Sequence, residues 1–328
     1  MATQADRLEA LIADFEASIR GAFRDFIRVA NSDVALARIN ELLEFGDIEG
    51  ALQVVESYIR RFADNIALIQ TEIGADAAAE LTLIASTTPM AISFDPSYPR
   101  AAQLIAASRL ALITQMTTVQ REAVRESISQ GFMSGAGTMD ISRSFRAAIG
   151  LHTQQVRWAA SYERRLRLLD AKALSMDLRD RRFDRSVLRA IQRGRPLTED
   201  KIARMVERYR ARALMYRADM IARTEAVRAT SLARHEAMLQ MIQQTGIDPR
   251  RIVRVWNATK DNRVRDYHAD MEQQRVGINE AFTDGNGNAL RWPGDPMAPA
   301  NTTINCRCAV TYEVKPPLQD IRATRFPQ

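Results

Sequence analysis

Apolar side chains recur at intervals of three and four along most of the chain, which is the spacing of one face of an α-helix. In residues 4–30 they are Leu8, Leu11, Ile12, Phe15, Ile19, Phe23, Phe26 and Ile27. The same spacing continues through residues 33–45 and 48–85, with a break expected near Gly74. The pattern predicts long amphipathic helices, typical of a helical bundle or an interaction arm.

Three prolines interrupt the helical pattern within residues 87–99 and predict an extended connector there. Helical spacing returns over residues 100–130 and stops at the glycine-rich residues 131–137. Thr138 is placed to be the N-cap of the next helix. The glycine-rich stretch lacks the Lys-Ser/Thr ending of a phosphate-binding loop, so it is interpreted as a turn between helices.

Helices are also expected over residues 153–174, over 178–193 and from Thr198 to Gly246, with a break in the last one near residue 215. Thr198 is a good N-cap, because the two carboxylates that follow it favour the positive end of the helix dipole. Gly246 is a good stop signal for the same helix.

The hydrophobic period changes after Pro249, where β-branched residues alternate with polar ones. Residues 251–257 and 303–314 are predicted strands, and residues 282–290 carry the turn signal of a hairpin. The expected fold is mainly α: long helices and a helical bundle followed by a small C-terminal α+β domain. The predicted domains are an acidic helical arm (1–95), a middle helical region (96–195), the α+β domain (196–315) and a basic, proline-containing tail (316–328).

Charge is divided unevenly along the chain. Residues 1–150 hold 13 basic and 19 acidic side chains, a net charge of −6, whereas residues 151–235 hold 21 and 10, a net charge of +11. Such a basic block can neutralise DNA phosphates. The alternative is a solvated helix face whose arginine stems cover apolar surface. The DNA-binding candidates are Arg157, Arg164, Arg165, Arg181, Arg182, Arg189, Arg208 and Arg212.

Several classes of protein are disfavoured by the composition. No apolar run reaches the roughly 18 residues that span a membrane, and residues 1–7 do not resemble a secretory signal. The two cysteines are separated by one residue and do not form a disulfide framework. We therefore expect an intracellular protein without a membrane segment.

Residues that carry chemistry concentrate between Arg254 and Val314. This stretch holds both cysteines, one of the three histidines and two of the three tryptophans. The motif residues, including the Arg-Thr-Glu that precedes the stretch, are Arg223, Thr224, Glu225, Trp256, Asp261, Arg263, Arg265, His268, Asn305, Cys306 and Cys308.

The order of these motifs resembles the phage head morphogenesis family, the minor capsid proteins similar to protein F of phage Mu. The order is Ile-Ala-Arg-Thr-Glu, Trp-Asn-Ala, Thr-Lys-Asp-Asn-Arg-Val-Arg-Asp-Tyr-His, Pro-Gly-Asp-Pro and Asn-Cys-Arg-Cys. The resemblance covers about residues 125–314. Family members often have a glycine a few residues after the histidine, where this chain has Met271-Glu-Gln-Gln.

The resemblance implies a virion component of the capsid interior or portal vertex, present in few copies and in the host cytoplasm during assembly. The partners it implies are the portal protein, the major capsid protein and packaged double-stranded DNA, with no membrane. The acidic residues 1–95 lie outside the resemblance and are expected to dock on the portal or inner capsid wall.

His268, Cys306 and Cys308 have the side chains that ligate zinc, with a fourth ligand from Asp261, Asp266 or Asp270. The preferred interpretation has no cofactor: the cysteines pack as small core residues and the histidine forms a hydrogen bond.

Three charged or polar neighbours, Arg223, Thr224 and Glu225, are expected to clamp their helix to the sheet. In this hypothesis Arg223 and Glu225 pair with Arg263, Arg265 or Asp266. No nucleophile lies beside a partner base, so catalysis is not expected. Trp256 and Trp292 are interpreted as core anchors, with base stacking as the alternative; the other histidines, His152 and His235, are expected at the surface or an interface.

The sequence therefore predicts a minor capsid protein that binds and positions, without turnover. The runner-up is a metal-dependent hydrolase of head maturation or DNA entry, and a third hypothesis is a general DNA-binding protein without a virion role.

Overall fold

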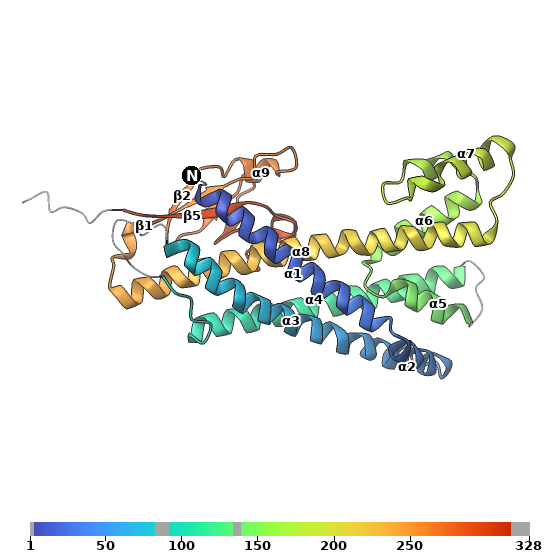
Figure 1. The fold of residues 1–328 in the computed structure, drawn as a ribbon, viewed down its shortest axis with the longest axis horizontal. Coiled ribbons are helices and arrows are strands. Elements are labelled where there is room, and N and C mark those ends of the chain that lie inside the picture. Colours follow the sequence, from blue (N-terminus) through green and yellow to red (C-terminus); the bar gives the residue numbers. More distant parts are fainter. Residues whose placement is uncertain (1–2, 83–91, 134–138, 316–328) are drawn as a thin grey trace, which may run out of the picture. The chain divides into compact units, whose positions relative to one another are not determined.

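The computed structural model describes residues 3–82, 92–133 and 139–315. The described part is mainly helical with a small group of antiparallel strands (Figure 1), so the predicted fold class is confirmed. The α-helices are α1 (Gln4–Ala30), α2 (Asp33–Glu44), α3 (Ile48–Thr82), α4 (Pro99–Met133), α5 (Met139–Ala148), α6 (Thr153–Arg167), α7 (Asp184–Arg193), α8 (Glu199–Thr245), α9 (Asp266–Ala269) and α10 (Ala300–Thr303). The 3₁₀-helices are η1 (Ala171–Ser175), η2 (Arg181–Phe183) and η3 (Pro249–Arg251). The strands are β1 (Ile252–Asn257), β2 (Arg275–Gly277), β3 (Phe282–Thr283), β4 (Ala289–Leu290) and β5 (Ala309–Val314).

Two expected helix breaks are wrong. Helix α3 continues through Gly74, where a Cβ atom would lie 2.1 Å from the ring of Phe94. The glycine therefore permits close packing and does not end the helix. Helix α8 continues through residue 215, since its sequence contains neither glycine nor proline.

Helix α6 ends earlier than expected, at Arg167, because Leu169 adopts a left-handed φ of 53°. The predicted helix over 178–193 begins only at Asp184, after η2. Predicted strands at 251–257 and 282–290 are confirmed as β1 and the β3–β4 hairpin. Thr138, part of the proline connector and the tail after Lys315 lie outside the described residues.

The chain forms two compact units, each discontinuous in sequence. Unit 1 comprises Met1–Ile19, Ile66–Ser108 and Met220–Gln328, and unit 2 comprises Arg20–Asn65 and Arg109–Asp219. Helices α1, α3, α4 and α8 contribute residues to both units. The predicted domains were continuous segments, whereas each observed unit combines segments that are distant in sequence.

Unit 1 is built on a three-stranded antiparallel sheet in the order β2-β1-β5 (Figure 1). The central strand β1 is buried almost throughout, and Trp256 is fully buried at its end. The core joins the sheet to the last turns of α8 through residues such as Met238 and Met241. Hydrophobic burial of this set is the main stabilising contribution to the unit.

A buried arginine connects three elements of unit 1. Arg234 of α8 pairs with Glu80 of α3 at 2.8 Å and donates a hydrogen bond to the Val310 carbonyl of β5 at 2.8 Å. Its guanidinium lies over the Tyr312 ring, 5.4 Å from the centroid. Arg7 of α1 also reaches Glu80, at 3.3 Å. Burial raises the cost of breaking such a pair, because the remaining charge cannot reach water.

Unit 2 contains two apolar clusters. Phe23, Phe26 and Phe62 pack ring against ring, with centroids 5.7–5.9 Å apart. In the second cluster, α6, α7 and the first turns of α8 enclose stacked Tyr162 and Tyr209 rings, 4.7 Å apart. This second cluster fixes the orientation of α7, whose outer face carries much of the basic charge described below.

Candidate functional site

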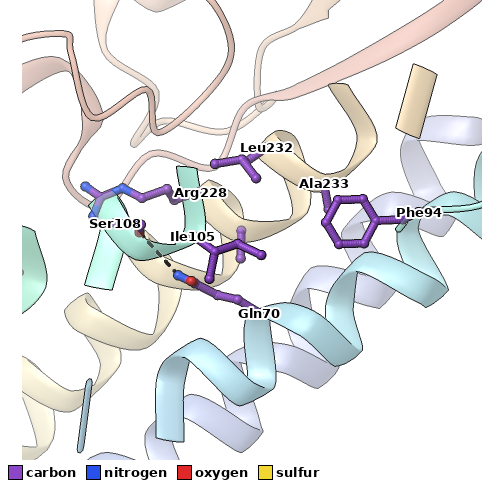
Figure 2. Close-up of a pocket in the computed structure, with 8 residues that line it drawn as sticks. Gln70, Phe94, Ile105, Ser108, Arg228, Leu232 and Ala233 are labelled. Atoms are coloured by element: carbon purple, nitrogen blue, oxygen red, sulfur yellow. Dashed lines mark hydrogen bonds between the residues drawn. The ribbon is translucent and has the colours of Figure 1, made fainter. Parts of the chain in front are cut away.

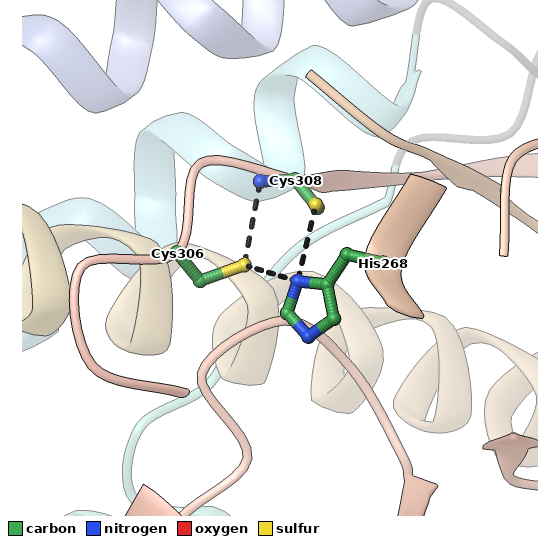
Figure 3. A group of neighbouring side chains, drawn as sticks. All are labelled: His268, Cys306 and Cys308. Atoms are coloured by element: carbon green, nitrogen blue, oxygen red, sulfur yellow. Dashed lines mark hydrogen bonds between the residues drawn. The ribbon is translucent and has the colours of Figure 1, made fainter. Parts of the chain in front are cut away.

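Both cysteines converge on one histidine nitrogen (Figure 3). Cys306 Sγ lies 3.6 Å and Cys308 Sγ 3.7 Å from Nδ1 of His268, which belongs to α9. The three side chains are at most 2% exposed. The sequence hypothesis of core cysteines beside a hydrogen-bonding histidine and the zinc hypothesis both require this proximity, and the structure provides it.

The two thiols differ in their acidity because they are hydrogen-bonded to each other. The hydrogen bond from the Cys306 thiol lowers the pKa of Cys308, and the neighbouring His268 lowers it further. The same hydrogen bond, together with burial, raises the pKa of Cys306. The pair thus favours a thiolate at Cys308, which is the ionisation state of a metal ligand.

The Arg-Thr-Glu segment of α8 holds the chain just before Cys306. Asn305 has a left-handed φ of 59°. Its backbone N–H donates to Thr224 Oγ1 at 2.9 Å, and its side-chain oxygen accepts from Arg223 Nη1 at 2.9 Å. These two bonds fix a turn that places Cys306 and Cys308 toward His268. Thr224 and Arg223 are therefore positioning residues for the cysteine pair.

Glu225 has a different partner from the one expected. It accepts from Arg228 Nη1 at 2.8 Å, one helical turn along α8, and Arg228 also donates to the Gly294 carbonyl at 3.2 Å. The predicted pairing of Glu225 with Arg263, Arg265 or Asp266 is wrong, because the i,i+3 neighbour on the same helix is closer. Burial raises the pKa of Glu225, and Arg228 opposes that shift.

Arg223 likewise does not pair with Asp266. In addition to Asn305, it contacts Glu16 of α1 at 3.2 Å. Arg223 and Arg228 join α8 to the C-terminal part of the chain through the turns at Asn305 and Gly294, not through the strands.

Asp261 and Arg265 support the cysteine turn from the other side. Asp261 accepts two hydrogen bonds from Arg307, the residue between the cysteines, and one from the Arg263 backbone. The hydrogen bonds from Arg307 lower the pKa of Asp261 to about 2. Arg265 donates to the Ile304 carbonyl. Because both carboxylate oxygens of Asp261 accept hydrogen bonds from Arg307, Asp261 is poorly placed to ligate a metal ion.

The aromatic residues and remaining histidines are placed as follows. Trp256 and Trp292 are 0% and 2% exposed, so the structure places both in the core. His235 packs against Trp292 with ring centroids 4.9 Å apart and is buried, contrary to its expected surface or interface position. His152 is exposed and its side chain caps α6.

The predicted DNA-binding residues separate into two groups. Four of them already bind acidic partners: Arg157 with Glu126, Arg165 with Asp170, and Arg182 and Arg212 with Asp180. The other four are exposed and form no ion pair among the described residues: Arg164, Arg181, Arg189 and Arg208. Only the second group retains its full charge for a polyanion.

Sequence reasoning missed an ordered set of arginines. Arg185, Arg189 and Arg193 lie four residues apart on the exposed face of α7, and Arg181 continues the spacing into η2. None of the four has a carboxylate partner among the described residues. We call these four residues the arginine row. The four-residue spacing was visible in the sequence and could have identified the set.

A small cavity lies in unit 1 between α3, α4 and α8 (Figure 2). Its lining includes Gln70, Ser108 and Leu232, and Gln70 donates a hydrogen bond to Ser108 at 3.4 Å. Its volume of about 10 Å³ is near the minimum that holds one water molecule. This cavity is too small to be a substrate site.

The fold and these sites define a class: a mainly helical protein in which the Arg-Thr-Glu segment of a long helix and the nearby Arg228 are hydrogen-bonded to turns of the C-terminal α+β part. Residues 181–311 match the family described as Phage Mu protein F like protein. This match confirms the resemblance drawn from the motifs.

The family is one of structural and morphogenesis proteins, so the match indicates a phage head morphogenesis protein associated with virion assembly. No curated protein and no solved structure matches the chain. Within the described residues, no helix is both long enough and apolar enough to cross a membrane.

Proposed function

We propose that this protein is a minor capsid protein of a tailed phage, which docks at the portal or inner capsid wall and contacts packaged DNA without catalysing a reaction. The observation that carries the proposal is the family match over residues 181–311. The matched segment also contains the whole arginine row. Portal protein, major capsid protein and double-stranded DNA are the partners of the proposal.

The arginine row supports the DNA contact. Four residues of α-helix rise by about 6 Å, so the guanidinium groups form a linear array of positive charge. The opposite face of α7 buries Val187 and Ala190 in the second cluster of unit 2, which keeps the row turned outward. A regular array without base-reading groups fits contacts to the phosphate backbone, which are independent of sequence.

The test of the DNA contact is the salt dependence of binding to a random-sequence duplex. Each lost phosphate contact lowers the slope of log K against log salt by about 0.9, so Arg185→Gln with Arg189→Gln lowers it by about 1.8. Arg24→Gln with Arg60→Gln is the matched control, since both residues are exposed in unit 2 and the charge change is equal. Equal slopes for the two double variants contradict a contact through the row.

The α2–α3 turn supports docking by the N-terminal helices. Phe45 is 84% exposed and Ile48 is 37% exposed, with the acidic residues Glu44 and Asp47 beside them. An apolar side chain held in water within an acidic rim is suited to a protein partner. Deleting residues 1–95 would remove core segments of both units, so point variants give the clearer test.

The docking test is a pull-down of the full chain against the portal protein of the same phage. Phe45→Ser is expected to reduce capture at least tenfold. Leu68→Ser, which alters an exposed apolar residue away from this turn, in α3, leaves capture unchanged. Equal capture of both variants rules out the α2–α3 turn. A wild-type chain that fails to bind the portal redirects the proposal to the capsid wall.

The hydrolase alternative gains no support from the described residues. A hydrolytic metal centre needs an open coordination position that substrate can reach. His268, Cys306 and Cys308 are at most 2% exposed, and the cavity described above is lined by other residues.

A further inference from the structure

The group formed by His268, Cys306 and Cys308 has a feature that one hydrogen bond to the histidine nitrogen does not explain. Both sulfur atoms approach the same ring nitrogen, Nδ1, at 3.6 and 3.7 Å, and the three ligand atoms lie within 4.8 Å of one another (Figure 3). An imidazole nitrogen has either one lone pair or one hydrogen, so it forms one good hydrogen bond. Two sulfur atoms at equal range indicate a common centre between the three atoms.

The distances agree with tetrahedral ligation of zinc. Zinc lies about 2.3 Å from a thiolate and about 2.0–2.1 Å from an imidazole nitrogen, and a tetrahedral angle then separates nitrogen and sulfur by about 3.6 Å. The observed nitrogen–sulfur separations, 3.6 and 3.7 Å, match this value.

Burial and charge favour a cation at this position. Two thiolates and one divalent ion sum to zero charge, which suits side chains that are only 1–2% exposed. Thiolate and imidazole together are typical zinc ligands, whereas magnesium and calcium prefer oxygen.

The surrounding contacts hold the ligands in place before a metal arrives. Arg307, between the two cysteines, binds Asp261, while the sulfur atoms of both cysteines lie beside His268 Nδ1. Thr224 and Arg223 fix the left-handed turn at Asn305 that precedes Cys306. These contacts hold both cysteines beside His268, although the cysteines are separated by one residue and not by the two residues of common zinc motifs.

We propose that His268 Nδ1, Cys306 Sγ and Cys308 Sγ bind one structural zinc ion that ties α9 to the start of β5. The described residues offer no fourth His, Cys, Asp or Glu side chain within this group, so water completes the coordination. Binding releases the thiol protons to solvent and involves no redox step. The inference stands independently of the virion role proposed above.

The experiment measures zinc in the full chain, purified with zinc in the medium and then passed through a desalting column. About one zinc per chain is expected. Less than about 0.1 overturns the proposal, as does a disulfide between Cys306 and Cys308 in the purified protein. The ion is expected to be lost from His268→Gln and from Cys306→Ser with Cys308→Ser.

His235→Gln is the matched control, because it alters another buried histidine of unit 1 and is expected to retain the ion. Loss of zinc from this control as well would indicate that the variants misfold. Cobalt binding by the wild-type chain then tests the proposal without any substitution. Cobalt added to the metal-free wild-type chain is expected to give a thiolate-to-metal charge-transfer band that zinc abolishes. Its absence from folded wild-type protein overturns the proposal.

Discussion

Replacing Thr224 with valine isolates one hydrogen bond that holds the cysteine turn. Valine has nearly the same shape as threonine, but it cannot accept the N–H of Asn305, now 2.9 Å from Thr224 Oγ1. Thr224 also donates to the Met220 carbonyl at 2.7 Å, a bond to an oxygen of the preceding helical turn. The first bond joins α8 to the turn before Cys306, whereas the second stays within the helix.

The expected loss of stability follows from the Asn305 N–H, which has no acceptor in the variant. A buried donor that loses its acceptor costs about 1–3 kcal/mol, and Thr224 is only 7% exposed. Asn305 also occupies a left-handed conformation that most residues avoid, so its turn depends on such external bonds. We expect Thr224→Val to lower the free energy of unfolding by about 2 kcal/mol. The assay is urea denaturation followed by circular dichroism.

Two control variants separate the possible causes. Thr224→Ser keeps the hydroxyl and should recover most of the loss. Thr71→Val removes a hydroxyl that bonds only to the Ala67 carbonyl at 3.1 Å, at an exposed position of α3, so it reports the cost of the intrahelical bond alone. A loss from Thr224→Val no larger than that from Thr71→Val would refute the argument that Asn305 depends on Thr224.

Three other predictions concern buried ionisable side chains of unit 1. Arg234→Met removes the buried partner of Glu80 and should cost about 3 kcal/mol in denaturant unfolding; a loss below 1 kcal/mol would contradict the buried pair. Burial lowers the pKa of His235 to about 3, below its ordinary value of 6.5, so only the unfolded chain gains a proton between these values. Stability should therefore be complete above pH 6.5 and fall by about 1.4 kcal/mol per pH unit below it, a slope that His235→Gln should remove in parallel titrations. Asp295→Asn disturbs a buried carboxylate that binds arginine and should cost about 2–4 kcal/mol, whereas Asp248→Asn, at a more exposed arginine pair, should cost clearly less. Equal unfolding free energies for the two variants would show that burial does not matter there.

The helices were predictable because their apolar spacing is local information. The continuity of α8 was not, since exposed Met215 and Tyr216 interrupt its apolar stripe while the backbone stays helical. The helix break expected at Gly74 was wrong for a related reason. Gly74 permits the close approach of Phe94, a tertiary contact that the spacing of apolar residues does not reveal.

The candidate site shows the same division between local and distant information. The residue types identified His268, Cys306 and Cys308 as a candidate group, and the order of the motifs suggested the family. The strand predicted over 303–314 begins only at Ala309, after both cysteines. Arg223 donates a hydrogen bond to the Asn305 side chain and Thr224 accepts one from the Asn305 N–H; both bonds cross about 80 residues of sequence, so the sequence alone did not predict them. By contrast, the i,i+3 pair of Glu225 with Arg228 was local and could have been predicted.

One contact of unit 1 has a consequence for the order of folding during translation. The Tyr312 N–H on the outer edge of β5 donates to the Gln4 side chain at 3.1 Å, across 308 positions of sequence. A ribosome adds about 5–20 residues per second, so roughly 15–60 s pass between the synthesis of these two residues. During that interval residues 1–19 of unit 1 are present without residues 220–328 of the same unit. Unit 1 therefore closes late in synthesis, and its first helix must be protected from aggregation until the last strand has emerged.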